Sequence, residues 1–286
     1  MGNGKKVVLI TGCSSGFGRE MVSMFLREGW AVIATMRRAE DRKQVFARER
    51  PDSSDDLAVL NLDVTSPAER SQVYHAVQGR WDKLDCLVNN AGYGLFGALE
   101  DLSEQQFRHQ FETNFWGAVF MTRQFLPLLR KSGGRIINVS SVAGFSALPL
   151  ASAYVASKFA LEGLSESLYY ELKSHGVQVA LVEPGRFPTR FSDNVLWGEA
   201  DVGSGAPYSD QTGHYMRFRT KLASENGTSP KAVAATILRL ARARNMPLRT
   251  RCGKDATAFY MFKKLTPENL LARLLSVLYH RVLLKP

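Results

Sequence analysis

The residues best suited to chemistry are a tyrosine and a lysine four positions apart, Tyr154 and Lys158. They stand in a stretch with helical character, in which residues four apart project from one face, one turn from each other. A phenol with a pKa of about 10 is a poor acid–base group near neutrality, and a nearby ammonium lowers that pKa. The spacing predicts a tyrosine that exchanges a proton with a carbonyl or alcohol oxygen. A half-buried tyrosine beside a solvated lysine remains the alternative for the pair alone.

A second group lies thirteen residues earlier, where an apolar segment ends in Ser140 and Ser141. If that segment is a strand of a parallel sheet, its carboxyl end faces the ligand. Ser141 is therefore expected to lie near Tyr154 and Lys158.

The elements that must position these residues alternate between short apolar runs and amphipathic stretches, as βαβ units do. The sequence predicts an α/β fold with a doubly wound parallel sheet of the Rossmann type, helices on both faces and a C-terminal helical extension. Its expected strands are Val7–Thr11, Ala31–Met36, Leu57–Leu62, Cys86–Asn89, Arg135–Val139 and Val177–Glu183, with a short one at Leu248–Arg251.

The expected helices cover residues 17–29, 40–50, 67–82, 104–131, 152–175 and 230–243, with Thr65, Ser66 and Ser103 as candidate caps. The Gly-, Ser- and Pro-containing stretch 186–229 is too long for a plain connector and is expected to be a substrate lid. We expect one catalytic domain, 1–286, with residues 254–286 as the helical extension.

Three glycines follow the first expected strand, in the segment Thr11–Gly18. Gly12 suits a tight turn, Gly16 lets the backbone approach phosphate oxygens, and Gly18 allows close packing at a helix N-terminus. The GxxxGxG spacing predicts a pyrophosphate-binding turn, whereas a plain strand-to-helix turn is the alternative.

The second expected strand ends in Arg37 and Arg38, where a fold that selects NAD usually has a carboxylate for the ribose 2′-hydroxyl. A guanidinium fork matches a 2′-phosphate, so NADP(H) is favoured over NAD. The alternative is that both arginines begin a solvated helix.

With these motifs in order, residues 5–253 resemble the short-chain dehydrogenase/reductase family. The match includes the glycine turn, Asn89–Gly92, Asn114, Ser141, Tyr154 with Lys158, and Pro184-Gly185 with Thr189. The nearest subgroup contains estradiol 17β-hydroxysteroid dehydrogenase and photoreceptor-type retinol dehydrogenase, and many bacterial oxidoreductases are similar. The region beyond Pro184 does not match steroid-binding elements, which leaves a steroid or retinoid substrate open.

The resemblance implies four catalytic residues. Tyr154 would be the general acid, and Ser141 would bind the substrate oxygen. Lys158 would lower the pKa of Tyr154 and hold the nicotinamide ribose. Asn114 would keep a relay water in line with Lys158. The implied cofactor-binding residues are Gly12, Ser14, Ser15, Gly16, Phe17, Gly18, Arg37, Asp63, Asn90, Ala91, Gly92, Tyr154, Lys158, Pro184, Gly185 and Thr189. Among them, Ser15 and Arg37 would contact the 2′-phosphate, Asp63 the adenine and Thr189 the nicotinamide carboxamide, while Asn90 would line the cofactor channel.

Apolar residues of the lid predict an apolar or aromatic carbonyl substrate, although they are equally compatible with packing: Phe187, Phe191, Val195, Leu196 and Trp197. His214, Tyr215 and Arg217 are possible polar contacts to the substrate, and no role is assigned to them.

In the tail, leucines and a valine recur at helical spacing, at Leu271, Leu274, Leu275, Leu278 and Val282. This stripe is expected to pack on the domain or a dimer interface, or to lie on an anionic membrane, helped by Lys263, Lys264, Arg281 and Lys285.

Composition excludes other classes. Three cysteines without CxxC spacing favour a reducing compartment, and five scattered histidines predict no metal site. The net charge of +10 resides in residues 215–286, with fifteen Lys/Arg against three Asp/Glu. No nucleic-acid motif accompanies it, so a solvated basic face is expected instead. The polar start, Met1–Lys6, does not fit a signal peptide, and we expect a cytoplasmic protein, with peripheral membrane attachment as the alternative.

The function expected is NADPH-dependent reduction of a ketone or aldehyde. Oxidation of an alcohol with NADP is the first alternative, because one site catalyses both directions. A nucleotide sensor or scaffold that lost turnover is the second, and the complete set of Asn114, Ser141, Tyr154 and Lys158 speaks against it. A homodimer or homotetramer is expected, with the helices of 104–131 and 152–175 pairing across a two-fold axis.

Overall fold

A parallel sheet of seven strands forms the centre of the computed structural model, which describes residues 4–40, 45–46, 56–187, 195–199, 206–224 and 229–282. The strand order is β3-β2-β1-β4-β6-β7-β9. These strands are β1 (Val7–Ile10), β2 (Ala31–Met36), β3 (Leu57–Asn61), β4 (Cys86–Asn89), β6 (Arg135–Val139), β7 (Gln178–Pro184) and β9 (Arg249–Cys252). The order reverses beside β1, so the predicted doubly wound Rossmann-type sheet is confirmed.

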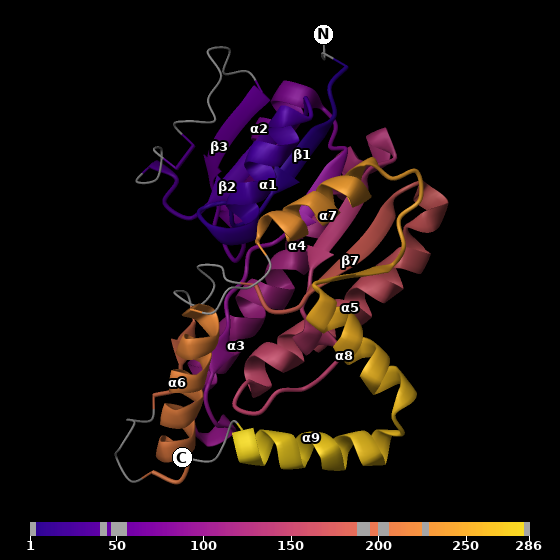
Figure 1. Cartoon of the computed structure of the whole chain (residues 1–286). Coiled ribbons are helices and arrows are strands. Elements are labelled where there is room, and N and C mark those ends of the chain that lie inside the picture. The colour runs from indigo at the N-terminus through magenta and orange to yellow at the C-terminus, as the bar shows by residue number, and fades with distance from the viewer. Residues whose placement is uncertain are drawn as a thin grey trace.

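The strands are buried on both faces, which is why they read as continuous apolar runs. In β1, Val8 and Ile10 contact the core on one face, while Val7 and Leu9 contact the core on the other. The first face is covered by α1 (Gly16–Arg27) and α7 (Lys231–Arg242), and the second by α2 (Pro67–Trp81), α4 (Gly117–Ser132) and α5 (Ser152–Glu171). Figure 1 shows α1 and α7 side by side in front of the sheet.

Two predicted helical features differ in the structure. The stretch 104–131 divides into α3 (Glu104–Phe111), a π-helical turn (Glu112–Trp116) and α4. Ser66 and Ser103 cap their helices as predicted, but Thr65 does not, because its hydroxyl and its amide both donate to the carboxylate of Asp63. Of the predicted helix 40–50, residues 41–44 and 47–50 lie outside the described part of the chain.

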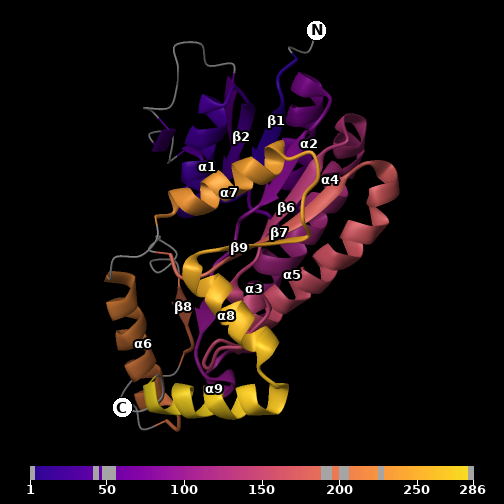
Figure 2. The same cartoon turned by 45° about the vertical axis from the view of Figure 1, so that its right-hand side comes forward.

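The elements beyond the carboxyl ends of the strands form a separate group (Figures 1 and 2). They are α6 (Ser209–Ser224), α8 (Lys254–Leu265) and α9 (Glu268–Val282), with α9 running across the far end of the molecule. A small parallel pair, β5 (Leu95–Phe96) and β8 (Leu196–Trp197), lies on the same side. These elements lie at the end of the sheet at which ligands of such folds bind.

The predicted apolar stripe of the tail is divided between two faces of α9. Leu271 is buried and Leu275 half-buried, whereas Leu274 and Leu278 are exposed; the side chain of Val282 lies outside the described part. Within the described residues, no helix is both long enough and apolar enough to span a bilayer.

Candidate active site

The candidate site lies where the strand order reverses. β1 pairs with β2 on one side and β4 on the other, so the glycine turn after β1 and the Asn89–Gly92 segment after β4 lie next to each other. Asn90 joins the two. Its side-chain amide donates to the carbonyls of Thr11 and Gly12, at 2.8 and 3.1 Å, and its backbone N–H donates to the Thr11 hydroxyl. Asn90 thus braces the turn; its expected place along the cofactor remains a prediction.

Steric limits explain the glycines of this turn. Gly12 has a φ of +72°, and a Cβ there would lie 2.9 Å from the Cα of Ala91. A Cβ on Gly18 would clash with the carbonyl of Gly12 and approach Asn90 Nδ2 at 2.9 Å. The backbone is therefore packed against backbone, and only glycine fits at either position.

This turn fits a dinucleotide phosphate. Helix α1 begins at Gly16, directly after the turn, and its N-cap residue, Ser15, makes no capping bond with its side chain. A helix start at the carboxyl end of a central strand presents backbone donors and a positive dipole end to an anion. Ser14, Ser15, Gly16 and Phe17 are all half-buried, so the turn is not covered by the fold.

The other residues expected to bind the cofactor follow β2, β3 and β7, and their contacts differ. Arg37 follows β2, is exposed, and its charge acts on Tyr93, whose pKa burial raises to about 12. Oδ1 of Asp63 accepts two bonds from Thr65, so one of its oxygens is committed to the turn after β3. Gly185 follows Pro184 at the end of β7 and lies so close to Asp255 of α8 that a Cβ would meet the carboxylate at 2.5 Å. Thr189 lies outside the described residues.

The π-helical turn positions Asn114, which is 2% exposed. Its amide donates to the carbonyl of Tyr93 at 2.9 Å and to the Ser157 hydroxyl at 3.3 Å, and its Oδ1 accepts from the Tyr93 N–H at 3.1 Å. Insertions of this kind often mark functional residues. The contacts tie the loop after β4 to α5, while the role of Asn114 as a water ligand remains a prediction.

Tyr154 and Ser141 meet, as expected from the sequence. Tyr154 lies near the start of α5 and is 8% exposed, and its hydroxyl is hydrogen-bonded to the Ser141 side chain, which comes from the end of β6. Burial raises the pKa of Tyr154 above its ordinary value, and the Ser141 bond and the charge of Arg219 only partly offset this. Among the protein groups, burial outweighs the interactions that favour the phenolate, and the expected effect of Lys158 on the pKa of Tyr154 remains a prediction.

Lys158 is the other half of the pair and is 7% exposed. Its Nζ lies 5.9 Å from the centre of the Tyr154 ring and donates to the carbonyl of Val139 at 2.9 Å. Burial lowers the pKa of Lys158 to about 8, although Glu162 raises it in part. Tyr154, Ser141 and Lys158 are thus assembled at the carboxyl end of β6.

Sequence reasoning missed Arg219, which reaches this site from α6. Its guanidinium carbon lies 3.9 Å from the centre of the Phe96 ring and 5.9 Å from that of Tyr215. The sequence singled out Tyr215 but not the residue four positions on, which must share its helical face. Arg217, which the sequence did single out, is exposed.

Apolar side chains surround Tyr154 on the side of α6 and α9. Phe96, Ala143, Ala151 and Tyr215 are buried with it. Of the expected lid residues, Val195 and Trp197 pack against this cluster, whereas Leu196 is 48% exposed. Phe187 contacts Phe17 instead, and Phe191 lies outside the described residues.

Among the described residues, no group of His, Cys, Asp or Glu is arranged to hold a metal ion.

The comparisons agree with this geometry. Residues 6–199 match the family described as short chain dehydrogenase. A 3-ketodihydrosphingosine reductase of Bacteroides thetaiotaomicron is 34% identical over 276 residues, which are 96% of this chain and 98% of the reductase. Retinol dehydrogenase 8 of Bos taurus is 34% identical over 275 residues, covering 93% of this chain and 88% of that enzyme.

Solved structures of short-chain dehydrogenases are also similar to this chain. A short-chain dehydrogenase from Streptomyces avermitilis superposes with a TM-score of 0.79 at 32% identity, over 97% of both chains. One from Burkholderia phymatum was solved with NAD (TM-score 0.74, 25% identity, 86% of this chain and 88% of that one). A serine dehydrogenase was solved with NADP+ (TM-score 0.71, 27% identity, 86% and 93%). The chain therefore belongs to the short-chain dehydrogenase family of oxidoreductases, whose fold binds a nicotinamide cofactor.

Proposed function

We propose that this protein is an NADPH-dependent carbonyl reductase that converts an apolar ketone or aldehyde into the alcohol. The observation that carries the proposal is the buried Tyr154 hydroxyl, bonded to Ser141 and surrounded by apolar side chains. The phenol is protonated at neutral pH, which is the form that a general acid needs. Because burial disfavours its ionisation, the phenolate that forms requires a neighbouring positive charge.

The protein groups then have distinct tasks. Ser141 orients the substrate oxygen, and Tyr154 donates its proton to that oxygen as the carbonyl is reduced. Lys158, fixed by Val139, holds a positive charge beside the phenol and stabilises the phenolate that forms. The bound nicotinamide supplies the hydride. Asn114 secures the loop of Tyr93 against α5 and is proposed to hold the water that returns a proton to Lys158.

The first test is the initial rate of NADPH oxidation with a panel of aromatic ketones, aldehydes, steroids, retinal and long-chain keto compounds. We expect turnover with the apolar members and a loss of at least about 100-fold in kcat for Tyr154→Phe, since general acid catalysis is worth about that much or more. Turnover only with alcohols and NADP+ would support the oxidative alternative. Tight NADPH binding without any turnover would favour the sensor alternative.

NADPH selectivity is proposed to come from Arg37 with Ser15. Arg37 follows β2, near Tyr93 and the loop after β4. Arg37→Gln should raise the KM for NADPH about tenfold or more and leave that for NADH nearly unchanged, because only NADPH carries the 2′-phosphate. Arg38→Gln is the matched control, since Arg38 is the adjacent exposed arginine. Equal effects on both cofactors would contradict this assignment.

An apolar, lipid-like substrate is proposed from the cluster around Tyr154. Tyr279 of α9 and Phe218 of α6 pack against that cluster, so the C-terminal helices lie on the substrate side. The two relatives described above are named for a long-chain sphingoid ketone and for retinol, which supports this substrate class.

The outer face of α9 is proposed to rest on an anionic lipid surface exposed to the cytoplasm. Its inner face packs on the protein through Leu271 and Tyr279, but Leu270, Leu274, Val277 and Leu278 are each about half exposed. Exposed Arg273 and Arg281 flank this row, and residues 215–286 have fifteen Lys/Arg against three Asp/Glu. This combination suits anionic headgroups better than a second copy of the same cationic face.

Sedimentation with vesicles tests this surface. The wild-type chain should bind vesicles with about one quarter phosphatidylserine and not neutral ones, and Leu274→Glu with Val277→Glu should abolish binding without changing the melting temperature. Ser276→Glu is the control, at an exposed position of the same helix. If the wild-type chain has twice the monomer mass in ultracentrifugation and the double variant has the monomer mass, the exposed face binds a second copy, and the proposal is overturned.

A dimer or tetramer through the helices of 104–132 and 152–171 is proposed separately. Trp116 and Phe159 are 40% and 44% exposed on these elements, where a two-fold partner would cover them. Ultracentrifugation at micromolar concentration measures the mass, and a monomer would contradict this expectation.

A further inference from the structure

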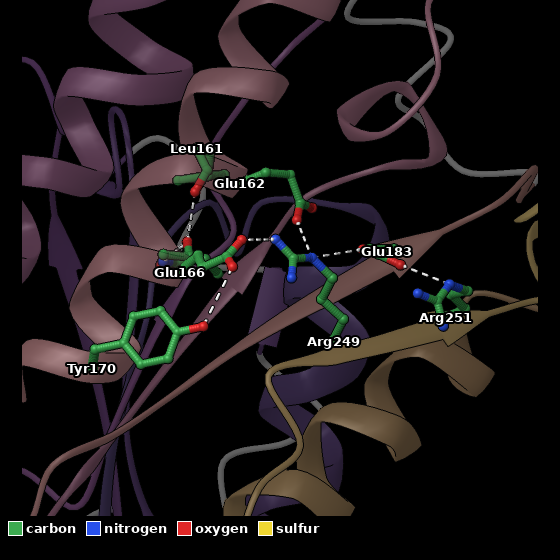
Figure 3. A network of polar contacts seen from close by, with 9 residues as sticks. Leu161, Glu162, Glu166, Tyr170, Glu183, Arg249 and Arg251 are labelled. Atoms are coloured by element: carbon green, nitrogen blue, oxygen red, sulfur yellow. Dashed lines mark hydrogen bonds and ion pairs between the residues drawn. The ribbon is translucent and has the colours of Figure 1, made fainter. Parts of the chain in front are cut away.

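A chain of charged residues begins one turn beyond the catalytic lysine. Glu162 follows Lys158 by four positions on α5 and is 6% exposed. Figure 3 shows its carboxylate directed toward Arg249 of β9, together with Glu166 from the same helix. The α5 face that presents Lys158 thus continues into an ion-pair network.

Arg249 holds this network together. Its Nε donates to Glu162 at 2.9 Å, and another guanidinium nitrogen donates to Glu166 at 2.7 Å. The two carboxylates differ in surroundings, because the side chain of Glu162 is 8% exposed and that of Glu166 is 44% exposed. One arginine therefore has a buried partner close to the catalytic lysine and a solvated partner one turn further away.

Two more charges close the network on the side of the sheet. Glu183 of β7 is 1% exposed and lies 3.7 Å from Arg249 and 3.2 Å from Arg251. Burial and the nearby Glu162 together raise the pKa of Glu183 to about 7, although Arg251 and Arg249 lower it in part. Arg249 lies closer to Glu162, at 2.9 Å, than to Glu183, so Glu162 is its main buried partner.

Glu162 also contacts the strand end that carries Ser141. Its carboxylate faces the Ser140 side chain, next to Ser141 in sequence, and this neighbour lowers the pKa of Glu162 in part. It fills the space beside Gly144, where a Cβ would lie 3.0 Å from Glu162 Cγ and 2.5 Å from the Ser140 hydroxyl. Glu162 therefore lies beside the segment that carries Ser141, one turn of α5 away from Lys158.

We propose that Glu162 is a positioning residue that Arg249 keeps ionised, so that it holds Lys158 in its cationic form and seats the segment bearing Ser141. The inference rests on the proposed function, which gives Lys158 and Ser141 their tasks. It assigns to β9, far along the chain, a direct influence on the catalytic lysine.

The charges around Lys158 agree with this arrangement. Burial lowers the pKa of Lys158 to about 8, and Glu162 is the group that raises it. On α5 itself, Tyr154 and Glu166 are the other titratable neighbours, and β7 and β9 contribute Glu183, Arg249 and Arg251. Burial raises the pKa of Glu162, while Ser140 and Arg249 lower it.

The direct test is the titration of Lys158 by NMR in the full chain with 13Cε-labelled lysine, with Lys158→Arg to assign the signal. The wild-type midpoint is expected near the Lys158 pKa of about 8. In Glu162→Gln it should move about one pH unit lower, because an uncharged amide no longer favours the ammonium. Arg249 keeps Glu166 and Glu183 as partners in this variant, so the fold has no unpaired guanidinium.

Glu166→Gln is the matched control and should leave the midpoint in place, since it removes the exposed partner of the same arginine. Glu162→Asp keeps the charge and should restore the wild-type midpoint to within a few tenths of a unit. Arg249→Met should lower the midpoint as Glu162→Gln does, because Glu162 without its guanidinium takes up a proton. Equal midpoints in wild type and a folded Glu162→Gln, or equal shifts in Glu162→Gln and Glu166→Gln, would overturn the proposal.

The kcat profile of any substrate found to turn over adds a second readout. Its alkaline limb should move down in Glu162→Gln in step with the NMR midpoint. The titration itself needs neither substrate nor cofactor. A failed search for activity with a shifted Lys158 would therefore count against the proposed function only.

Discussion

Lys158 on α5 donates a hydrogen bond to the carbonyl of Val139, the last residue of β6, at 2.9 Å. The bond fixes the helix that carries Tyr154 against the strand that leads into Ser141. The same ammonium thus links the two elements that carry Tyr154 and Ser141.

The pH profile of reduction should reflect this lysine. Burial raises the pKa of Tyr154 above its ordinary value, so the phenol is not the first of the two groups to titrate, whereas Lys158 loses its charge near its pKa of about 8. We expect kcat to be constant below that pH and to fall as the pH rises through it, as the ammonium that stabilises the phenolate is lost. Stopped-flow rates between pH 6 and 10 measure this fall of kcat. A flat profile up to pH 10 would show that the charge of Lys158 is not needed.

Replacing Arg219 should affect catalysis although it lies outside the recognised motifs. Arg219→Met removes the cation 3.9 Å from the Phe96 ring and the charge that lowers the pKa of Tyr154. We expect kcat/KM to fall about tenfold, which corresponds to about 1.4 kcal/mol, between the values of an exposed and a desolvated cation–π contact. Arg217→Met, on the exposed side of α6, is the control and should be near wild type. Similar losses in both would point to a general effect on α6.

Gly18→Ala should weaken cofactor binding and stability together. Its Cβ would clash with the carbonyl of Gly12, which forces the phosphate-binding turn apart. We expect the Kd for NADPH, measured by fluorescence, to rise about 100-fold or more. Gly79→Ala provides the comparison, because nothing lies within 4 Å of its Cβ on α2, and alanine there should stabilise the helix by roughly 1 kcal/mol. Unaltered NADPH affinity in Gly18→Ala would remove the turn from the cofactor site.

Glu183 should make the protein less stable as the pH rises. Its folded pKa of about 7 lies above the ordinary value of 4.5, so between these values the folded state holds a proton that the unfolded chain has lost. Stability therefore falls through this range by up to roughly 3 kcal/mol, and the loss is complete above about pH 7. Glu183→Gln should flatten the decline in melting temperature between pH 5 and 8 in calorimetry. A decline as steep as that of the wild type would contradict the raised pKa.

Much of the fold was accessible from the sequence, because apolar runs and glycine turns reflect local constraints. The strands around β1 and the helix of Tyr154 and Lys158 were predicted within a few residues. The π-helical turn was not, since one extra backbone residue around Asn114 leaves no trace in the apolar periodicity. The division of the α9 stripe was also unpredictable, because periodicity does not tell which of two adjacent faces meets the protein.

For this protein, spacing along single elements was enough to predict the parallel sheet, and it also predicts the glycine turn as a phosphate site and a set of candidate catalytic residues. The surroundings of those residues became known from the folded chain alone. Arg219 and Arg249 come from distant elements, and the pKa values of Tyr154 and Lys158 depend on burial that no single segment encodes. Desolvation and long-range ion pairs arise only when the chain is packed, which is why they could not be predicted from the order of its residues.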